Sequence, residues 1–346
     1  MLSIAVKSNN KLEIAQISKP TLKKSSVLVK VNVSGLCGSD LPRIFDDGAH
    51  FYPIVLGHEF SGEVVEVGVD VSRVKAGDRI ACAPLVPCGD CPQCQKGRYS
   101  LCKDYSFIGS RVQGGNAEYV EVPEKCCFVL DESVSSIEGA FFEPLTVSLH
   151  PILMAGGVEG KDVIVVGVGT IGLLAVQAAK AMGAASVTAI DIDEEKLTKA
   201  KLLGADYSLN SLGQDFSLEM KSVPLNGEQQ LILETAGSPA SVKQCLNIAA
   251  PRASIALIGT LHHDLTLTHP EFGQILRKEL TLFGSWMNYS APYPGKEWEI
   301  ARELFSNKLI DTQALLDGVY EPSEFVTRVE ALNGQSPDGK ILLKWS

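Results

Sequence analysis

Residues 162–191 have the sequence "DVIVVGVGTIGLLAVQAAKAMGAASVTAID", and this stretch decides the fold of the middle of the chain. "DVIVVG" is a short, continuous apolar run, which is typical of a parallel strand that is covered on both faces. The next residues follow helical spacing up to a glycine, and "SVTAID" forms a second strand. Apolar strands and helices go on alternating to about residue 287, which predicts a doubly wound parallel sheet.

A glycine motif joins the first of these strands to its helix. Gly167, Gly169 and Gly172 stand in a G-x-G-x-x-G frame, and this context makes the motif informative. The free N–H groups of such a helix N-terminus bind a pyrophosphate. Asp191 ends the next strand, where a carboxylate bonds the adenosine ribose and repels a 2′-phosphate, so NAD is predicted rather than NADP. Lys196 is a further ribose candidate, or else a solvated helix lysine.

The flanking regions differ in character from this α/β segment. Residues 1–150 are rich in alternating, strand-like patterns such as those at 26–36, 61–67 and 79–83. Residues 288–346 are mixed, with two helical patterns and a closing strand. We therefore expect a β domain at 1–150, an α/β domain at 151–287 and a C-terminal segment at 288–346.

The charge and the N-terminus limit the class of protein. Lys and Arg number 31 against 41 Asp and Glu, which gives a formal charge of -10. This balance disfavours nucleic acid or an anionic membrane as a partner. The sequence shows neither a signal-peptide pattern nor an apolar span of membrane length. A cytoplasmic location is therefore expected, where thiols stay reduced.

Four cysteines cluster in residues 87–102, "PCGDCPQCQKGRYSLC". Cys88, Cys91, Cys94 and Cys102 have the spacing C-x2-C-x2-C-x7-C, and four thiolates form a closed tetrahedral shell for zinc. A structural zinc is predicted. The alternatives are ordinary loop cysteines or a thiol–disulfide redox site, which the fourth cysteine disfavours.

A second set of possible metal ligands is dispersed along the chain. Cys37 lies in "GLCGSD" (35–40), His58 and Glu59 in "LGHEFSGEVVEVG" (56–68), and Glu143 in "FFEPLTV" (141–147). A catalytic zinc uses three protein ligands and keeps one position open. Cys37, His58 and Glu143 would supply these three, with Glu59 as an alternate fourth ligand. Each residue alone is more often a core or turn residue, so the prediction rests on their combination.

These motifs, in this order, resemble the zinc-dependent medium-chain alcohol and polyol dehydrogenases, and the resemblance covers essentially the whole chain. It implies a GroES-like β-barrel catalytic domain, a Rossmann domain, and a C-terminal segment that returns to the catalytic domain. It also implies that Cys37, His58 and Glu143 bind the catalytic zinc, while Ser39 relays the substrate proton and Asp40 orients the His58 ring. Glu143 replaces the cysteine of many alcohol dehydrogenases, as in polyol dehydrogenases.

A closer likeness within the family is carried by "GSDLPRIFDDGAHFYPIVLGHEFSGE" (38–63), "FIGSR" (107–111) and "ELTLFGSWMNYS" (279–290). It resembles members whose substrate is a phosphorylated hexitol, and so implies oxidation of such a substrate to a ketose phosphate with transfer of hydride to NAD. Arg43 and Arg111 are candidates for contact with its phosphate, and either can equally be a surface or ion-pair arginine. Asn288 and Tyr289 either line the substrate site or pack at a hinge. The alternatives are a sorbitol- or threonine-type dehydrogenase and a non-catalytic nucleotide-binding relative. A homodimer or homotetramer is implied.

Overall fold

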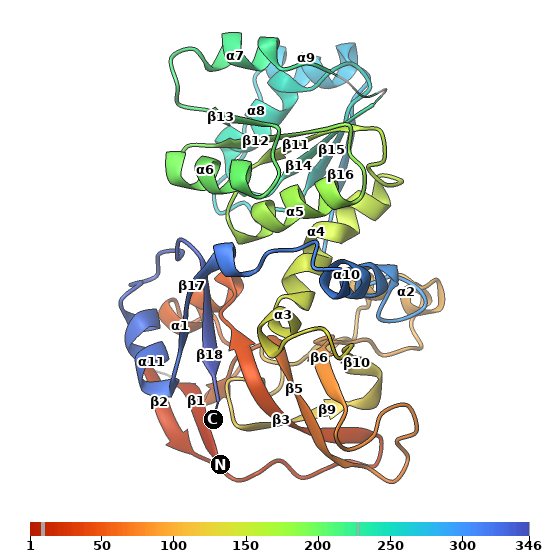
Figure 1. Ribbon diagram of the computed structural model, residues 1–346, viewed down its shortest axis with the longest axis vertical. Helices are drawn as coiled ribbons and strands as arrows, with labels where there is room; N and C mark the ends of the chain where they lie inside the picture. The colour runs from red at the N-terminus through yellow and green to blue at the C-terminus, as the bar shows by residue number, and fades with distance from the viewer. Residues whose placement is uncertain (8–10, 226, 228, 346) are drawn as a thin grey trace. The chain divides into compact units, whose positions relative to one another are not determined.

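The computed structural model describes residues 1–7, 11–225, 227 and 229–345 (Figure 1). The chain divides into two compact units. Unit 1 comprises Met1–Glu143, Tyr289–Ser306 and Leu315–Ser346, and unit 2 comprises Pro144–Asn288 and Asn307–Ala314. Among the described residues, none of the helices has the length and apolarity that a membrane span requires.

Unit 2 contains a six-stranded parallel sheet with the order β13-β12-β11-β14-β15-β16. The doubly wound parallel sheet is thus confirmed. The order reverses between β11 and β14, and the carboxyl ends of such neighbouring strands form the usual ligand crevice. The strands are β11 (Asp162–Val166), β12 (Ser186–Asp191), β13 (Tyr207–Asn210), β14 (Gln230–Glu234), β15 (Ser254–Leu257) and β16 (Thr281–Gly284).

Helices cover both faces of this sheet, with α5 and α6 on one face and α8 and α9 on the other (Figure 1). Their starts follow local capping chemistry: Asp193 Oδ1 accepts hydrogen bonds from the backbone N–H groups of Glu195 and Lys196 at the start of α6. The helices of this region are α4 (Phe142–Met154, which begins in unit 1), α5 (Thr170–Ala181), α6 (Glu194–Leu202), α7 (Phe216–Ser222), α8 (Pro239–Ile248) and α9 (His269–Arg277).

The segment Asn307–Ala314 belongs to unit 2, whereas the sequence placed all of 288–346 outside the α/β domain. The reason is a pair of hydrogen bonds from α5. The buried Gln177 side chain donates to the Asp311 carbonyl at 3.3 Å and accepts from the Asp311 N–H at 2.7 Å.

Unit 1 is built on a seven-stranded sheet that joins the two ends of the chain. β18 pairs antiparallel with β3 and parallel with β17, so the C-terminal strands extend a sheet of N-terminal strands. Separate three-stranded and two-stranded sheets complete the unit. The strands are β1 (Leu2–Lys7), β2 (Lys11–Gln16), β3 (Ser26–Gly35), β4 (Ile54–Val55), β5 (Glu59–Val67), β6 (Arg79–Cys82), β7 (Leu85–Val86), β8 (Ser106–Phe107), β9 (Tyr119–Pro123), β10 (Cys127–Val129), β17 (Leu316–Tyr320) and β18 (Lys340–Lys344).

Aromatic packing anchors the returning segment of unit 1. Phe305 on α10 stacks on Phe142 with ring centroids 4.9 Å apart, and Trp298 lies 5.7 Å from Phe128. These four rings are buried.

The helices of unit 1 are α1 (Leu41–Phe45), α2 (Pro92–Gln95), α3 (Ser136–Ala140), α10 (Lys296–Ser306) and α11 (Pro322–Glu330). The short 3-10 helices are η1 (Gly38–Asp40), η2 (Tyr99–Leu101), η3 (Glu124–Cys126) and η4 (Gln313–Leu315). The first two residues of η4, Gln313 and Ala314, belong to unit 2.

Because Phe305 is fully buried against Phe142, its truncation leaves a cavity that the neighbours fill only in part. We expect Phe305→Ala to lower the free energy of unfolding by about 3–5 kcal/mol. Leu202→Ala is the control, because Leu202 is 81% exposed and the change should stay within about 0.5 kcal/mol. Urea denaturation of both variants checks this, and equal stabilities would contradict the packing role.

Candidate metal centres and cofactor loop

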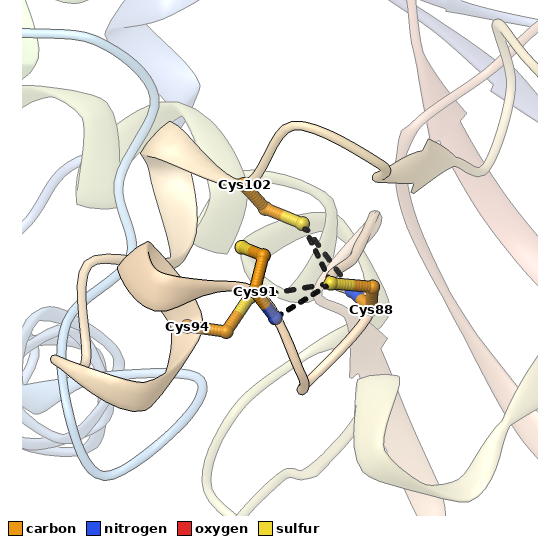
Figure 2. A group of neighbouring side chains, drawn as sticks. All are labelled: Cys88, Cys91, Cys94 and Cys102. Atoms are coloured by element: carbon orange, nitrogen blue, oxygen red, sulfur yellow. Dashed lines mark hydrogen bonds between the residues drawn. The ribbon is translucent and has the colours of Figure 1, made fainter.

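The four cysteines of the 87–102 segment converge on one point (Figure 2). Cys88 Sγ lies 3.5 Å from Cys102 Sγ and 3.9 Å from Cys94 Sγ. Four sulfurs each at about 2.3 Å from a zinc ion are about 3.8 Å apart in a regular tetrahedron. A disulfide would need about 2.05 Å, and all four cysteines are free. The spacing therefore fits a tetrathiolate zinc site.

Local backbone geometry prepares this lobe for a cation. Cys91 precedes α2, which Pro92 starts, and Cys94 lies within the same helix. Backbone N–H groups of Cys94 and Lys103 lower the pKa of Cys91 to about 6. Burial raises the pKa of Cys94 to about 12. Hydrogen bonds thus favour the thiolate form of Cys91, and burial disfavours that of Cys94.

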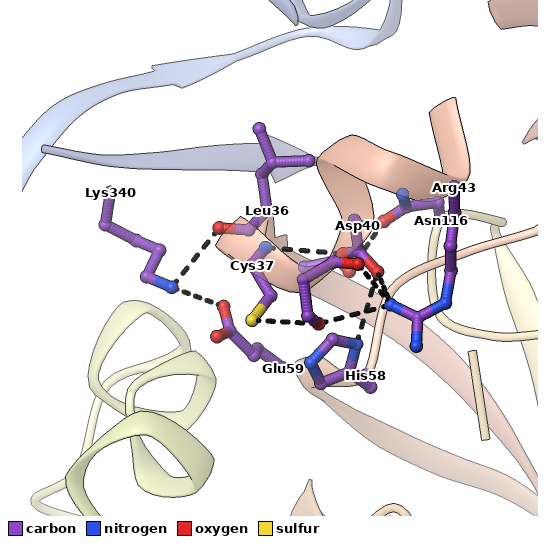
Figure 3. Close-up of polar contacts among 10 residues, drawn as sticks. Leu36, Cys37, Asp40, Arg43, His58, Glu59, Asn116 and Lys340 are labelled. Atoms are coloured by element: carbon purple, nitrogen blue, oxygen red, sulfur yellow. Dashed lines mark hydrogen bonds and ion pairs between the residues drawn. The ribbon is translucent and has the colours of Figure 1, made fainter. Parts of the chain in front are cut away.

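The second cluster joins Cys37, His58 and Glu59, whose candidate ligand atoms all lie within 4.8 Å of one another. Cys37 ends the loop after β3 and precedes η1, and Glu59 begins β5 opposite Gly35 of β3. His58 and Glu59 are buried, and Cys37 is half-buried. The strand pairing therefore brings together two sequence motifs that are about twenty residues apart (Figure 3).

Asp40 faces the inner nitrogen of the His58 ring. His58 Nδ1 lies 3.6 Å from Asp40 Oδ1, and Asp40 is fully buried. The Phe107 ring packs edge-on against the imidazole at 5.5 Å. Burial lowers the pKa of His58, but the negative charges of Asp40 and Cys37 outweigh this effect and raise it to about 10. The site thus has an excess of negative charge that attracts a cation.

Lys340 was not identified from the sequence, although it belongs to this cluster. Its ammonium donates to Glu59 Oε2 at 2.6 Å and to the Leu36 carbonyl at 3.2 Å, in a buried position (Figure 3). Burial lowers the pKa of Lys340, but the negative charges of Glu59 and Cys37 outweigh this effect and raise it. No local motif marks this lysine, because only the β3–β18 pairing brings it to Glu59.

Glu143 lies beside the cluster without entering the set of atoms within 4.8 Å. It is buried in the first turn of α4, and its charge contributes to the raised pKa values of His58 and Lys340. The Ser39 hydroxyl donates to Cys37 Sγ at 3.3 Å.

The glycine loop has the geometry of a dinucleotide-binding turn. A Cβ at Gly172 would lie 2.0 Å from the Gly167 carbonyl oxygen, so only glycine permits this approach of helix α5 to the loop. At Gly169, just before α5, an added Cβ would meet no atom within 4 Å. This open space lies at the helix N-terminus, where a phosphate group would bind.

Asp191 is held by the backbone around this loop. Its Oδ2 accepts from the Val168 N–H at 2.7 Å, and its Oδ1 accepts from the N–H groups of Ile192 and Asp193. Lys196 instead faces Asp193, with 3.9 Å between Nζ and Oδ2. The Asp191 carboxylate is therefore fixed beside the glycine loop.

The four candidate substrate residues differ in position. Arg43 and Arg111 lie in unit 1 with exposed or half-buried side chains. Asn288 and Tyr289, in contrast, are 0% and 2% exposed. Asn288 donates to Thr146 Oγ1 at 2.6 Å, and Tyr289 Oη accepts from the Leu85 N–H at 3.2 Å. Both side chains are thus buried and hydrogen-bonded within the protein, and a role in lining the substrate site stays a prediction beside hinge packing.

Two family models match the chain: "Alcohol dehydrogenase GroES-like domain" over residues 23–132 and "Zinc-binding dehydrogenase" over residues 170–307. Galactitol 1-phosphate 5-dehydrogenase of Escherichia coli K12 is 49% identical over 345 residues, which is 99% of each chain.

Solved structures agree with these matches. The crystal structure of Escherichia coli galactitol-1-phosphate dehydrogenase matches with a TM-score of 0.94 and 47% identity over 100% of both chains. An alcohol dehydrogenase of Escherichia coli CFT073 in complex with NADH matches with a TM-score of 0.88 and 29% identity, over 100% of this chain and 99% of that one. The chain therefore belongs to the zinc-dependent alcohol and polyol dehydrogenase family, with a GroES-like domain and a Rossmann domain.

Proposed function

We propose that this protein oxidises a secondary hydroxyl of galactitol 1-phosphate, a phosphorylated hexitol, by hydride transfer to NAD and gives a ketose phosphate. The observation that carries the proposal is the metal-ligand cluster of Cys37, His58 and Glu59 in a chain that is 49% identical, over its whole length, to galactitol 1-phosphate 5-dehydrogenase. A non-catalytic nucleotide-binding relative would not need such a cluster.

Cys37, His58 and Glu143 are the proposed ligands of the catalytic zinc, and Glu59 is the alternate ligand that Lys340 holds through one oxygen. The donor set of thiolate, imidazole and carboxylate suits zinc. The buried charges also fit a divalent ion. Around His58 lie the carboxyl groups of Asp40, Glu59 and Glu143 and the Cys37 thiol, with Arg43 and Lys340 as the cationic partners. The acidic groups of this set would balance the charge of a bound zinc ion.

Bound zinc would supply Lewis-acid polarisation of the substrate hydroxyl, and bound NAD would accept the hydride. The protein's own groups move the proton and fix the geometry. Ser39 Oγ, beside Cys37, is the proposed relay: it would accept the substrate hydroxyl proton while its own proton passes on through the nicotinamide ribose to solvent. Asp40 sets the orientation of His58 by facing Nδ1, which leaves Nε2 for the metal.

The remaining assignments follow the same reasoning. Cys88, Cys91, Cys94 and Cys102 are the proposed structural zinc ligands. Gly167, Gly169 and Gly172 form the proposed pyrophosphate site, and Asp191 is the proposed ribose contact. We further propose a cytoplasmic location and a homodimer or homotetramer.

The substrate assignment is tested by NADH formation with zinc-loaded protein on galactitol 1-phosphate, galactitol, sorbitol and L-threonine. We expect a strong preference for the phosphate ester. Turnover of galactitol or sorbitol alone would retain the mechanism and replace the substrate with an unphosphorylated polyol. Inactivity on all four, in protein that holds both zinc ions, would contradict the proposed function.

The catalytic zinc is tested by Cys37→Ala. The zinc content should fall from about two to about one per chain, and activity should fall on the order of a thousandfold, since metal polarisation provides several kcal/mol. Cys245→Ala is the control, because Cys245 is buried in unit 2. Full activity of a folded, NAD-binding Cys37→Ala protein would rule out the assignment.

Cofactor choice is tested by Asp191→Ser. Losing a charged hydrogen-bond partner should raise the KM for NAD by about 10- to 100-fold and increase turnover with NADP. Asp193→Asn removes the same charge two residues away and still caps α6, so its NAD-to-NADP preference should stay close to that of the wild type. If both variants behaved alike, Asp191 would not select the cofactor.

A further inference from the structure

Arg43 and Arg111 of unit 1 were equal candidates for contact with the substrate phosphate. The contacts that each side chain makes now distinguish between them. We propose that Arg111, stacked on Tyr105, binds the phosphate of the substrate, and that Arg43 instead positions Ser39. This inference rests on the proposed function, because it assumes that the substrate is a phosphate monoester.

Arg111 has a fixed guanidinium and an uncompensated charge. Its Cζ lies 4.2 Å from the centroid of the Tyr105 ring, and its Nη2 donates to Tyr105 Oη at 3.2 Å. Within the part of the chain that the structure describes, no carboxylate forms an ion pair with Arg111. The side chain is exposed. A positive charge that is oriented by a neutral tyrosine stays available for an anion.

The backbone ties Arg111 to the candidate zinc site. The N–H groups of Ser110, Arg111 and Val112 all donate to the Phe107 carbonyl, the one from Arg111 at 2.9 Å. The Phe107 ring in turn packs on His58 at 5.5 Å. The tight turn that carries Arg111 therefore begins at a residue in contact with a proposed zinc ligand.

The same turn is packed on the loop before His58. A Cβ at Gly109 would lie 2.5 Å from the Gly57 carbonyl oxygen, and Gly115 N–H donates to that oxygen at 2.8 Å. Gly114 N–H donates to the Val55 carbonyl, also at 2.8 Å. The position of Arg111 relative to the zinc ligands is thus set by backbone contacts and not by a long flexible loop.

Arg43 uses its hydrogen-bonding capacity locally. Its Nη1 donates to the Ser39 carbonyl, lies 3.2 Å from Ser39 Oγ and is 3.5 Å from Asp40 Oδ1. The Asp40 charge compensates that of Arg43. All these contacts use Nη1, so a phosphate on Arg43 would bind through Nε or Nη2 beside the Asp40 carboxylate, whereas a phosphate on Arg111 would meet no paired carboxylate among the described residues.

The chemistry of the substrate requires such an arrangement. In a 1-phosphate that is oxidised at C5, four C–C bonds, one C–O bond and one O–P bond separate the reacting carbon from phosphorus, which is about 7–8 Å in an extended chain at bond lengths of about 1.5 Å. The phosphate group therefore needs a cation that lies near the zinc ligands but does not contact them directly. A planar guanidinium can donate two parallel hydrogen bonds to phosphate oxygens, which a lysine cannot.

Arg111→Gln is the direct test, with Arg73→Gln as its control. Arg73 is also an exposed arginine of unit 1, so both changes remove one positive charge. For Arg111→Gln, the ratio of kcat/KM for galactitol 1-phosphate to that for galactitol should fall by about 10- to 100-fold. The ratio for Arg73→Gln should match that of the wild type. Arg111→Lys should lower this ratio less than Arg111→Gln, because lysine keeps the positive charge although it lacks the paired N–H groups of the guanidinium.

Binding without turnover provides an independent readout. Calorimetric titration of galactitol 1-phosphate into the enzyme–NADH complex should show a Kd that Arg111→Gln raises by the same factor. Tyr105→Ala should raise it more than Tyr105→Phe, which keeps the stacking ring.

Three outcomes would overturn the proposal, and they differ in what else they affect. If the wild type prefers galactitol 1-phosphate and Arg111→Gln keeps the wild-type ratio and Kd, the Arg111 inference fails while the proposed function stands. If Arg43→Gln instead lowers the ratio selectively, the phosphate contact belongs to Arg43. If the wild type prefers galactitol itself, the proposed function and this inference both fail.

Discussion

Excess buried negative charge is the constraint on which unit 1 depends. Asp40, Glu59 and Glu143 are all buried within one small region, together with the half-buried Cys37. Isolated buried anions cost several kcal/mol each, so such a set persists only with cations and hydrogen bonds around it. Lys340 and Arg43 provide part of this compensation. The negative charges around His58 raise its pKa, and the same charges would stabilise a bound divalent cation.

The need to compensate this buried negative charge explains why the C-terminal strands pair with the N-terminal strands of unit 1. Lys340 reaches Glu59 only because β18 lies beside β3, and α10 holds the preceding segment through the stacking of Phe305 on Phe142. The sheet register, the aromatic cluster and the buried ion pair are therefore parts of one arrangement. An unpaired Glu59 in this position would be a buried charge without a partner, and losing one member of a buried pair commonly costs about 3–5 kcal/mol.

The sequence predicted what local patterns encode. The strands and helices around the glycine motif follow from continuous apolar runs and 3.6-residue periodicity, and the parallel sheet is confirmed. The four-cysteine lobe was predictable because all its candidate ligands lie within sixteen residues, 87–102. Lys340 and the burial of Tyr289 were not predictable, since both depend on partners more than 200 residues away, Glu59 and Leu85. Periodicity carries no information about such pairings.

The two candidate metal centres differ for the same physical reason. In the lobe, one short segment supplies four sulfurs that can form a complete tetrahedral shell. In the second cluster, the candidate ligands come from three places, which are the residue before η1, the start of β5 and the first turn of α4, so their positions are set by the packing of the whole unit. A mixed shell of this kind can leave one coordination position for substrate, but its charge balance then depends on distant groups such as Lys340. A closed site stabilises its own lobe, whereas an open site must be stabilised by the rest of the fold.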